Sequence, residues 1–125
     1  RTYHGCAMPL HHQHASIQAW QDEEHVKENR TQYQKKFTDV LEILDSVLDV
    51  KKPDASFYLW AKTPASDEEF AKNLFAEQNI TVLPGSYLSR ESAGINPGSQ
   101  HVRMALVASY EECIEAAHRM RKFLE

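Results

Sequence analysis

Hydrophobic residues between positions 15 and 48 recur every three or four residues, the period of an α-helix. The apolar members of this stripe are Tyr33, Phe37, Val40, Leu41, Leu44, Val47 and Leu48. The stretch DEEHVKENR at 22–30 is nearly all polar, so a break is expected there if the helix is not continuous. A helix of this length extends about 50 Å, which exceeds the width of a small domain. Its first half is therefore expected to pack on something else, whereas residues 1–14 are predicted to be irregular.

Three short apolar runs predict the strands of a small sheet. The run SFYLWA at 56–61 carries large side chains on both faces, which is typical of a central strand covered on both sides. The runs ITVL at 80–83 and VRMALV at 102–107 are predicted to be strands too. In the last run, strand alternation places Val102, Met104 and Leu106 on one face and Arg103 on the other.

Two further helices are predicted by capping boxes, in which a Ser is followed three residues later by a Glu. The box at 66–69 opens a helix to about residue 78, and the box at 109–112 opens a helix to about residue 124. Residues 84–101 lack periodicity and are bracketed by two Pro-Gly pairs, which predicts a loop. Loops this long tend to be functional or disordered. The order of elements predicts an α/β (α+β) domain with a short mixed or antiparallel sheet and helices packed on one face.

Composition and charge narrow the class of protein. The chain has 125 residues, a formal net charge of −4 and 42% hydrophobic residues, as expected for one globular domain. No apolar run approaches the ~20 residues that span a bilayer, so no membrane association is expected. The mild acidity argues against nucleic-acid binding. The start lacks a signal peptide and an initiator Met, as if the chain were cut from a longer one.

Cysteine and histidine patterns give no metal or redox motif. Cys6 and Cys113 are far apart and no CxxC is present, so a zinc ribbon and a redox pair are both disfavoured, and a cytoplasmic location is the simplest expectation. Four histidines fall within residues 4–14, but they lie in one segment without a partnering Cys, Asp or Glu pattern. No metal site is predicted. Nucleophile and phosphate-loop motifs are absent as well.

Arg103 is the most informative candidate residue, because a guanidinium inside an apolar strand is rarely left unpaired. One interpretation is structural: an arginine on an edge strand in water, or a salt bridge within the fold. The other interpretation is a bidentate clamp on a ligand carboxylate or phosphate. The Pro-Gly loop immediately before the strand favours the clamp.

The chain resembles the C-terminal end of class I/II aminotransferases, pyridoxal-phosphate enzymes of fold type I. The resemblance rests on the order of a strand, PGS plus an aromatic residue (82–87), a glycine-containing loop (Gly94, Gly98) and the strand VRMAL (102–106). The segment ASFYLW at 55–60 resembles the first strand of the family's small domain. Residues 25–33 resemble its connecting helix.

The resemblance implies roles for several residues. Arg103 matches the arginine that binds the α-carboxylate of the amino-acid substrate. Ser86 and Tyr87 are then expected near the substrate entrance, and Tyr3 and His4 toward the partner subunit. The family further implies amino-acid and 2-oxo-acid substrates, a homodimer and pyridoxal phosphate as cofactor.

The chain departs from the family pattern in two ways. It lacks a lysine in a Ser-x-x-Lys context, to which the cofactor attaches, and it lacks the aspartate that pairs with the cofactor's pyridinium nitrogen. The lysines present are Lys27, Lys35, Lys36, Lys51, Lys52, Lys62, Lys72 and Lys122. The resemblance therefore implies a remnant of the large domain at 1–14, a long connecting helix at 15–50 and the small C-terminal domain at 51–125. No catalytic residue is expected in this chain, and it is expected to be inactive alone.

Within the family, the segments HHQHASIQAW and SRESAGINPG resemble the bacterial branch that transaminates succinyldiaminopimelate in lysine biosynthesis. Two alternatives remain open from the sequence. One is a free-standing regulatory α/β domain that binds a small carboxylate ligand through Arg103 without pyridoxal phosphate. The other is an interaction module that uses an aromatic surface.

Overall fold

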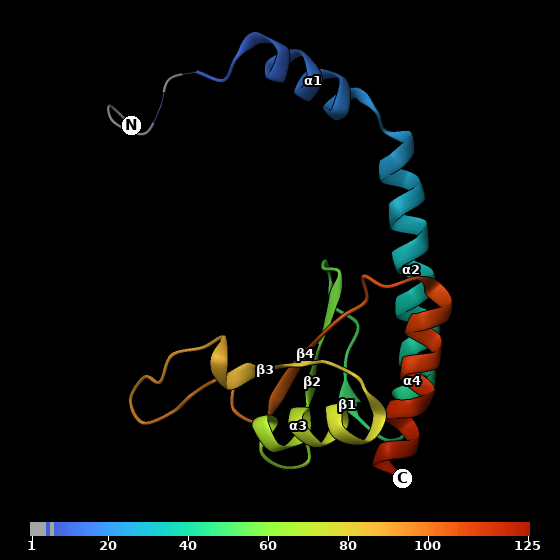
Figure 1. Cartoon of the computed structure of the whole chain (residues 1–125), viewed down its shortest axis with the longest axis vertical. Helices are drawn as coiled ribbons and strands as arrows, with labels where there is room; N and C mark the ends of the chain where they lie inside the picture. Colours follow the sequence, from blue (N-terminus) through green and yellow to red (C-terminus); the bar gives the residue numbers. More distant parts are fainter. Residues whose placement is uncertain (1–4, 6) are drawn as a thin grey trace. The chain divides into compact units, whose positions relative to one another are not determined.

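The computed structural model describes residue 5 and residues 7–125 (Figure 1). In chain order the elements are α1 (Leu10–Gln21), α2 (Glu24–Leu44), β1 (Asp49–Val50), β2 (Tyr58–Lys62), α3 (Asp67–Gln78), β3 (Leu83–Pro84), the 3-10 turn η1 (Gly85–Tyr87), β4 (His101–Ala105) and α4 (Tyr110–Leu124). The chain divides into two compact units, residues 1–31 and residues 32–125. None of the described helices has the length and apolar character needed to cross a membrane.

The N-terminal stretch forms two helices, and the break between them lies inside the polar stretch at 22–30, where a break was expected. The predicted ends of the helical region, residues 15 and 48, are wrong. Helix α1 already begins at Leu10, within the segment predicted to be irregular, and α2 ends at Leu44. The break falls at Asp22, whose backbone is extended and whose carboxylate accepts a hydrogen bond from the Glu24 amide at 3.0 Å. This side-chain acceptor competes with the helical hydrogen bond and starts α2 afresh.

The sheet has four antiparallel strands in the order β1-β2-β4-β3, which confirms the predicted small sheet. The inner strands β2 and β4 pair Leu59 with Met104 and Ala61 with Val102. Strand β1 was not predicted, because two residues carry no detectable period. Strand β3 occupies 83–84 rather than 80–83, at an edge of the sheet where a proline is tolerated.

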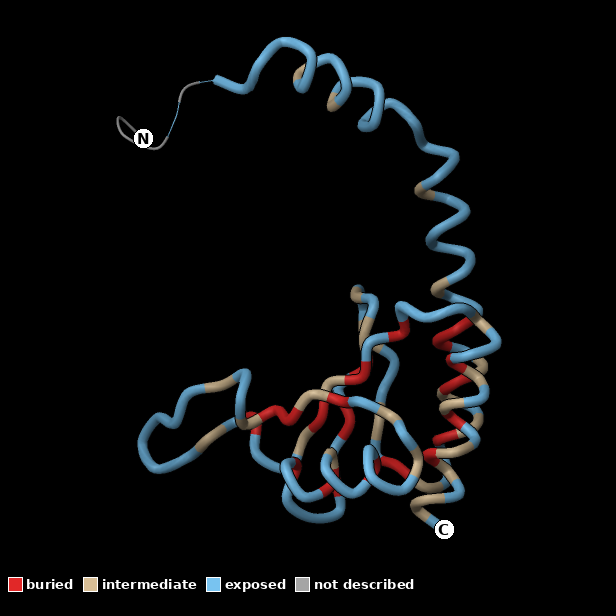
Figure 2. Tube along the Cα trace, viewed as in Figure 1, coloured by how far each residue is buried: buried red, intermediate tan, exposed pale blue. Residues whose placement is uncertain are grey.

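The core lies on one face of the sheet, as predicted. Leu59, Ala61 and Val102 are fully buried there. The C-terminal half of α2, together with α3 and α4, packs against this face. The buried residues of these three helices include Phe37, Val40, Leu44, Phe70, Leu74, Cys113, Ala117 and Met120. Figure 2 shows the buried positions gathered on these strands and helices.

The opposite face of the sheet is only partly covered, so the prediction that β2 is covered on both sides is wrong. On this face, Trp60 is 38% exposed and Lys62 is exposed. Leu59, which precedes Trp60 and faces the helices, is completely buried. Large side chains on both faces of a strand indicate where apolar contacts are available, and they do not show which of those contacts are made within this chain. The face that carries Tyr58, Trp60, Lys62, His101 and Arg103 is called the open face below.

The capping box predicted at 109–112 is confirmed, and of the box predicted at 66–69 the Ser66 half is confirmed. Ser109 and Glu112 form the complete reciprocal box at the start of α4. At the start of α3, the Ser66 hydroxyl accepts a hydrogen bond from the Glu69 amide at 3.4 Å. Helix α3 ends at Gln78 and is capped by Asn79, which adopts the left-handed conformation (φ 53°) typical of the residue after a helix.

Candidate functional site

Arg103 lies at the centre of β4 and its side chain belongs to the open face. Its neighbours Val102 and Met104 are buried under the helices, whereas Arg103 is half-buried, as strand alternation requires. Because β4 is an inner strand, the interpretation of Arg103 as an edge-strand residue is wrong. Trp60 of β2 and Leu83 of β3 are its register partners on the two sides.

No carboxylate of the described residues pairs with Arg103. The ion pairs found there are His25–Asp22, Arg119–Glu115 and Arg121–Glu125. The guanidinium carbon of Arg103 instead lies 5.4 Å from the ring centre of Tyr58, a cation–π arrangement that supports the charge without neutralising it. A half-buried guanidinium in this state retains its planar set of donors for a carboxylate.

The remaining side chains of the open face are aromatic or basic. The indole of Trp60 stacks on the ring of His101, with ring centres 5.5 Å apart and planes inclined by 10°. Lys62 is the register partner of His101. A shallow groove over this region is also lined by Lys51 and Lys52. This surface favours anionic ligands over cationic ones, although Asp49 lies at its margin.

Ser86 and Tyr87, both predicted near a substrate entrance, lie in η1 at the base of the loop that joins β3 to β4. The Ser86 hydroxyl donates to a carboxylate oxygen of Asp67 at 2.6 Å. Tyr87 is 65% exposed and its phenol donates to Glu68 at 3.1 Å, which raises the pKa of Tyr87. Both side chains thus have partners within the chain, and their role toward substrate stays a prediction.

Asp67 is the residue of this region that the sequence did not reveal. It is 5% exposed, and its carboxylate accepts hydrogen bonds from the amide and hydroxyl of Ser86 and from the amide of Gln100. Burial works to raise the pKa of Asp67, but these hydrogen bonds outweigh burial and hold the pKa below its usual value. In the sequence Asp67 is indistinguishable from an ordinary acidic residue in the first turn of a helix.

The two Pro-Gly pairs bring the ends of the loop together. Gly85 and Gly98 are in direct backbone contact, and a Cβ on Gly85 would lie 2.7 Å from the Trp60 ring and 2.8 Å from the His101 carbonyl oxygen. The Gly98 amide also donates to Asn96 Oδ1 at 3.0 Å and to Ser89 Oγ at 3.1 Å. The two ends of the loop therefore meet at its base, which Figure 1 shows between η1 and the start of β4.

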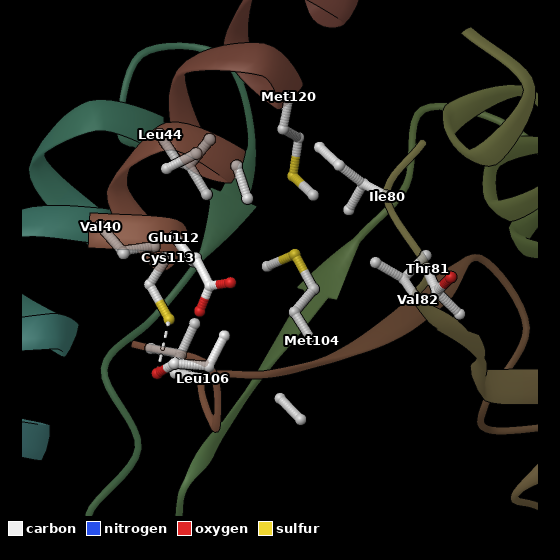
Figure 3. A pocket seen from close by; sticks show the side chains of 14 residues that line it. Val40, Leu44, Ile80, Thr81, Val82, Met104, Leu106, Glu112, Cys113 and Met120 are labelled. Carbon is white, nitrogen blue, oxygen red and sulfur yellow. Dashed lines mark hydrogen bonds between the residues drawn. The ribbon is translucent and has the colours of Figure 1, made fainter. Parts of the chain in front are cut away.

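On the helix side of the sheet lies an apolar pocket between α2, α4, β4 and residues 80–82 (Figure 3). Its lining includes Met104, Met120 and the thiol of Cys113, whose pKa is raised by burial. Glu112 reaches its margin, but this carboxylate is engaged by Ser109 in the cap of α4. This pocket is a gap in the hydrophobic core, and the candidate site is the open face around Arg103.

The described residues do not form a site for pyridoxal phosphate. Its aldehyde requires a reactive lysine, and every lysine except Lys36 is exposed. Lys36 is buried, and its ammonium donates to the carbonyl oxygens of Leu106 and Ala108. Among residue 5 and residues 7–125, no group of three or more His, Cys, Asp or Glu could hold a metal ion. Tyr3 and His4 lie outside the described residues.

Comparisons with known proteins agree on one family. The sequence profile of "Aminotransferase class I and II" matches residues 2–120. An LL-diaminopimelate aminotransferase from Maridesulfovibrio salexigens is 32% identical over 114 residues, which are 88% of this chain and 28% of that protein.

Solved structures give the same result. An aminotransferase from Neisseria meningitidis matches the whole chain and 32% of its own length, with 50% identity and a TM-score of 0.95. A probable N-succinyldiaminopimelate aminotransferase from Thermus thermophilus matches 82% of the chain and 26% of its own length, with 33% identity and a TM-score of 0.67. The chain thus spans between a quarter and a third of the length of these relatives.

Proposed function

Because the chain belongs to the class I and II aminotransferase family, we propose that it is the part of such an enzyme that binds the substrate's α-carboxylate. The whole enzyme would exchange an amino group between an amino acid and a 2-oxo acid. Both substrates carry an α-carboxylate, so one binding group serves both halves of the reaction. Membership of this family favours this function over a free-standing regulatory domain or an interaction module.

One observation carries the proposal: Arg103 is fixed on an inner strand and has no carboxylate partner among the described residues. A planar guanidinium accepts a carboxylate through two parallel hydrogen bonds, which sets its orientation as well as its position. Holding a reactant in one orientation accounts for a large share of enzymatic rate enhancement. Tyr58 restrains the guanidinium from one side and leaves its donors available.

The cofactor belongs to residues outside this chain in the proposal. Enzymes of this family use pyridoxal phosphate, which carries the amino group between the two substrates. Since Lys36 is engaged and the other lysines are exposed, the attachment point of the cofactor is assigned to a residue outside this chain. We therefore infer that the 125-residue chain is inactive by itself and that the complete enzyme, a homodimer by family resemblance, is active.

Diaminopimelate derivatives are the proposed substrates. Relatives named for LL-diaminopimelate and for N-succinyldiaminopimelate are both among the similar proteins, and the sequence resemblance points to the succinylated form. Lys51, Lys52 and Lys62 line a groove with Tyr58 and Trp60 of the open face, and these basic groups suit a substrate with more than one carboxylate.

The experiment is a transamination assay of the complete enzyme with 2-oxoglutarate as acceptor. N-succinyl-LL-diaminopimelate, LL-diaminopimelate, aspartate, alanine and phenylalanine are compared as donors by kcat/KM. We expect the succinylated donor to exceed the others by about tenfold or more, the value of a few well-placed contacts. Preference for another donor contradicts the substrate assignment alone, whereas no transamination with any donor contradicts the proposed function.

A further inference from the structure

Asp67 connects the two ends of the loop between β3 and β4. One carboxylate oxygen accepts the Ser86 amide at 2.9 Å and the Ser86 hydroxyl at 2.6 Å. The other oxygen accepts the Gln100 amide at 3.2 Å. Ser86 follows β3 and Gln100 precedes β4, so a single side chain fixes where both strands meet the loop. No ion pair of the described residues includes Asp67, so these three donors stabilise its charge.

Gln100 is held in a conformation that it would not keep without such contacts. Its φ of 57° lies in the left-handed region, which is unfavourable for a residue with a side chain. Asp67 accepts from the amide of Gln100, and the Gln100 carbonyl accepts from the amide of Thr63 at 2.8 Å. Both peptide groups of this residue are therefore restrained, and the direction in which β4 begins depends on them.

Arg103 lies three residues after Gln100. His101, the first residue of β4, stacks on Trp60, and Trp60 is the register partner of Arg103. On the other side of β4, the register partner of Arg103 is Leu83 in β3, three residues before Ser86. Movement at either end of the loop would therefore shift a strand that directly flanks the guanidinium.

We propose that Asp67 is a positioning residue for substrate binding: through Ser86 and Gln100 it fixes β3 and β4 so that Arg103 presents its guanidinium to the α-carboxylate in one orientation. This inference rests on the proposed role of Arg103. It assigns a function to a buried carboxylate whose hydrogen bonds go to Ser86 and Gln100.

The test is a double-mutant cycle in the complete enzyme, with kcat/KM for the best amino-acid donor as the readout. The single variants are Asp67→Asn and Arg103→Lys, and the double variant combines them. Asn preserves the shape of Asp67, but its amide nitrogen donates and cannot accept all three hydrogen bonds. Glu69→Gln is the matched control, because it removes a charge from the same helical turn at an exposed position.

We expect Asp67→Asn to lower kcat/KM about tenfold to a hundredfold, as expected when a binding group loses its orientation, and Glu69→Gln to leave it within about twofold. In the Arg103→Lys background, Asp67→Asn should lower kcat/KM by a much smaller factor, because the bidentate geometry that Asp67 maintains is already lost. Residues that act on one interaction are non-additive in this way. If Asp67 acted in folding alone, the loss of kcat/KM in the double variant would equal the product of the losses in the two single variants.

Each outcome has a distinct meaning. If Arg103→Lys has no effect, the proposed function of Arg103 fails and the inference fails with it. If Arg103→Lys lowers activity and Asp67→Asn is silent or its effect multiplies, the inference is wrong and the proposed function stands. Should Asp67→Asn fail to fold, Ser86→Ala takes its place in the cycle, because it removes only the hydroxyl hydrogen bond and keeps the Ser86 amide bonded to Asp67.

Discussion

At the scale of single residues, Arg103 and Asp67 differ in the partners that the described residues give them. Asp67 is almost fully buried and accepts three hydrogen bonds. Arg103 is half-buried and lies against the ring of Tyr58, and none of the ion pairs of the described residues includes it. This difference is the basis of the proposal that Arg103 binds an anion, whereas the three hydrogen bonds of Asp67 offset the cost of burying its charge.

The depressed pKa of Asp67 predicts how stability depends on pH. Because its pKa is lower in the folded than in the unfolded state, the ionised carboxylate contributes stability above the unfolded pKa of about 3.9 and loses it as the pH falls through the folded value. The difference in free energy of unfolding between wild type and Asp67→Asn should thus be constant from pH 5 to 8 and shrink below about pH 4. Urea unfolding of both proteins across this range measures it. A difference that persists unchanged at the lowest pH would contradict the assigned hydrogen bonds.

At the scale of elements, the loop between β3 and β4 depends on two glycines that allow its ends to touch. Gly85 and Gly98 meet through their backbones beside Trp60. Replacing Gly85 with Ala would place a methyl group against the Trp60 ring and the carbonyl of His101. The strain is expected to cost about 1–3 kcal/mol in the free energy of unfolding.

The control for Gly85→Ala is Gly94→Asn, at the far end of the same loop. Gly94 also has a positive φ of 78°, but no atom lies within 4 Å of a Cβ placed there, and Asn tolerates the left-handed region. We expect this variant to lower the free energy of unfolding by less than about 1 kcal/mol. Chemical denaturation of the two variants compares them, and equal losses would show that the close approach at Gly85 does not matter.

The elements also show which features a sequence can predict. The apolar alternation of β4 and the capping box at Ser109 are local signals, and both are confirmed. Strand β1 and the stacking of Trp60 on His101 depend on the register between distant segments, for which a single sequence carries no period. Arg103 was found because its charge interrupts an apolar run, whereas Asp67 was missed because nothing local distinguishes it.

At the scale of the whole molecule, the chain holds one part of the proposed enzyme. The N. meningitidis structure matches all of the chain but only 32% of its own length. In the proposal Arg103 binds the substrate carboxylate, whereas Lys36, the one buried lysine among the described residues, is engaged by two carbonyl oxygens. Substrate binding and cofactor attachment thus belong to different parts of the sequence in this account.

This division predicts the result of borohydride trapping. The purified chain is mixed with stoichiometric pyridoxal phosphate, and borohydride is added to reduce any imine. Intact-mass spectrometry then measures the mass of the protein. We expect no adduct at one preferred site, because all the other lysines share an exposed position and Lys36 is engaged by two carbonyl oxygens. Peptide analysis that finds one lysine fully modified would contradict the account of an inactive chain.

The most direct test of the central claim compares an amino-acid donor with the amine that lacks its α-carboxylate. The complete enzyme is assayed as wild type, as Arg103→Ala and, as a control in the exposed loop, as Arg90→Ala. For the amino acid, Arg103→Ala should lower kcat/KM by about a hundredfold or more, since charged hydrogen bonds contribute ~1.5–3 kcal/mol each. For the amine, the same variant should change kcat/KM by less than about threefold, and Arg90→Ala should leave both donors unaffected. Equal losses for both donors, or no loss for either, would contradict the assignment of Arg103 as the carboxylate-binding residue.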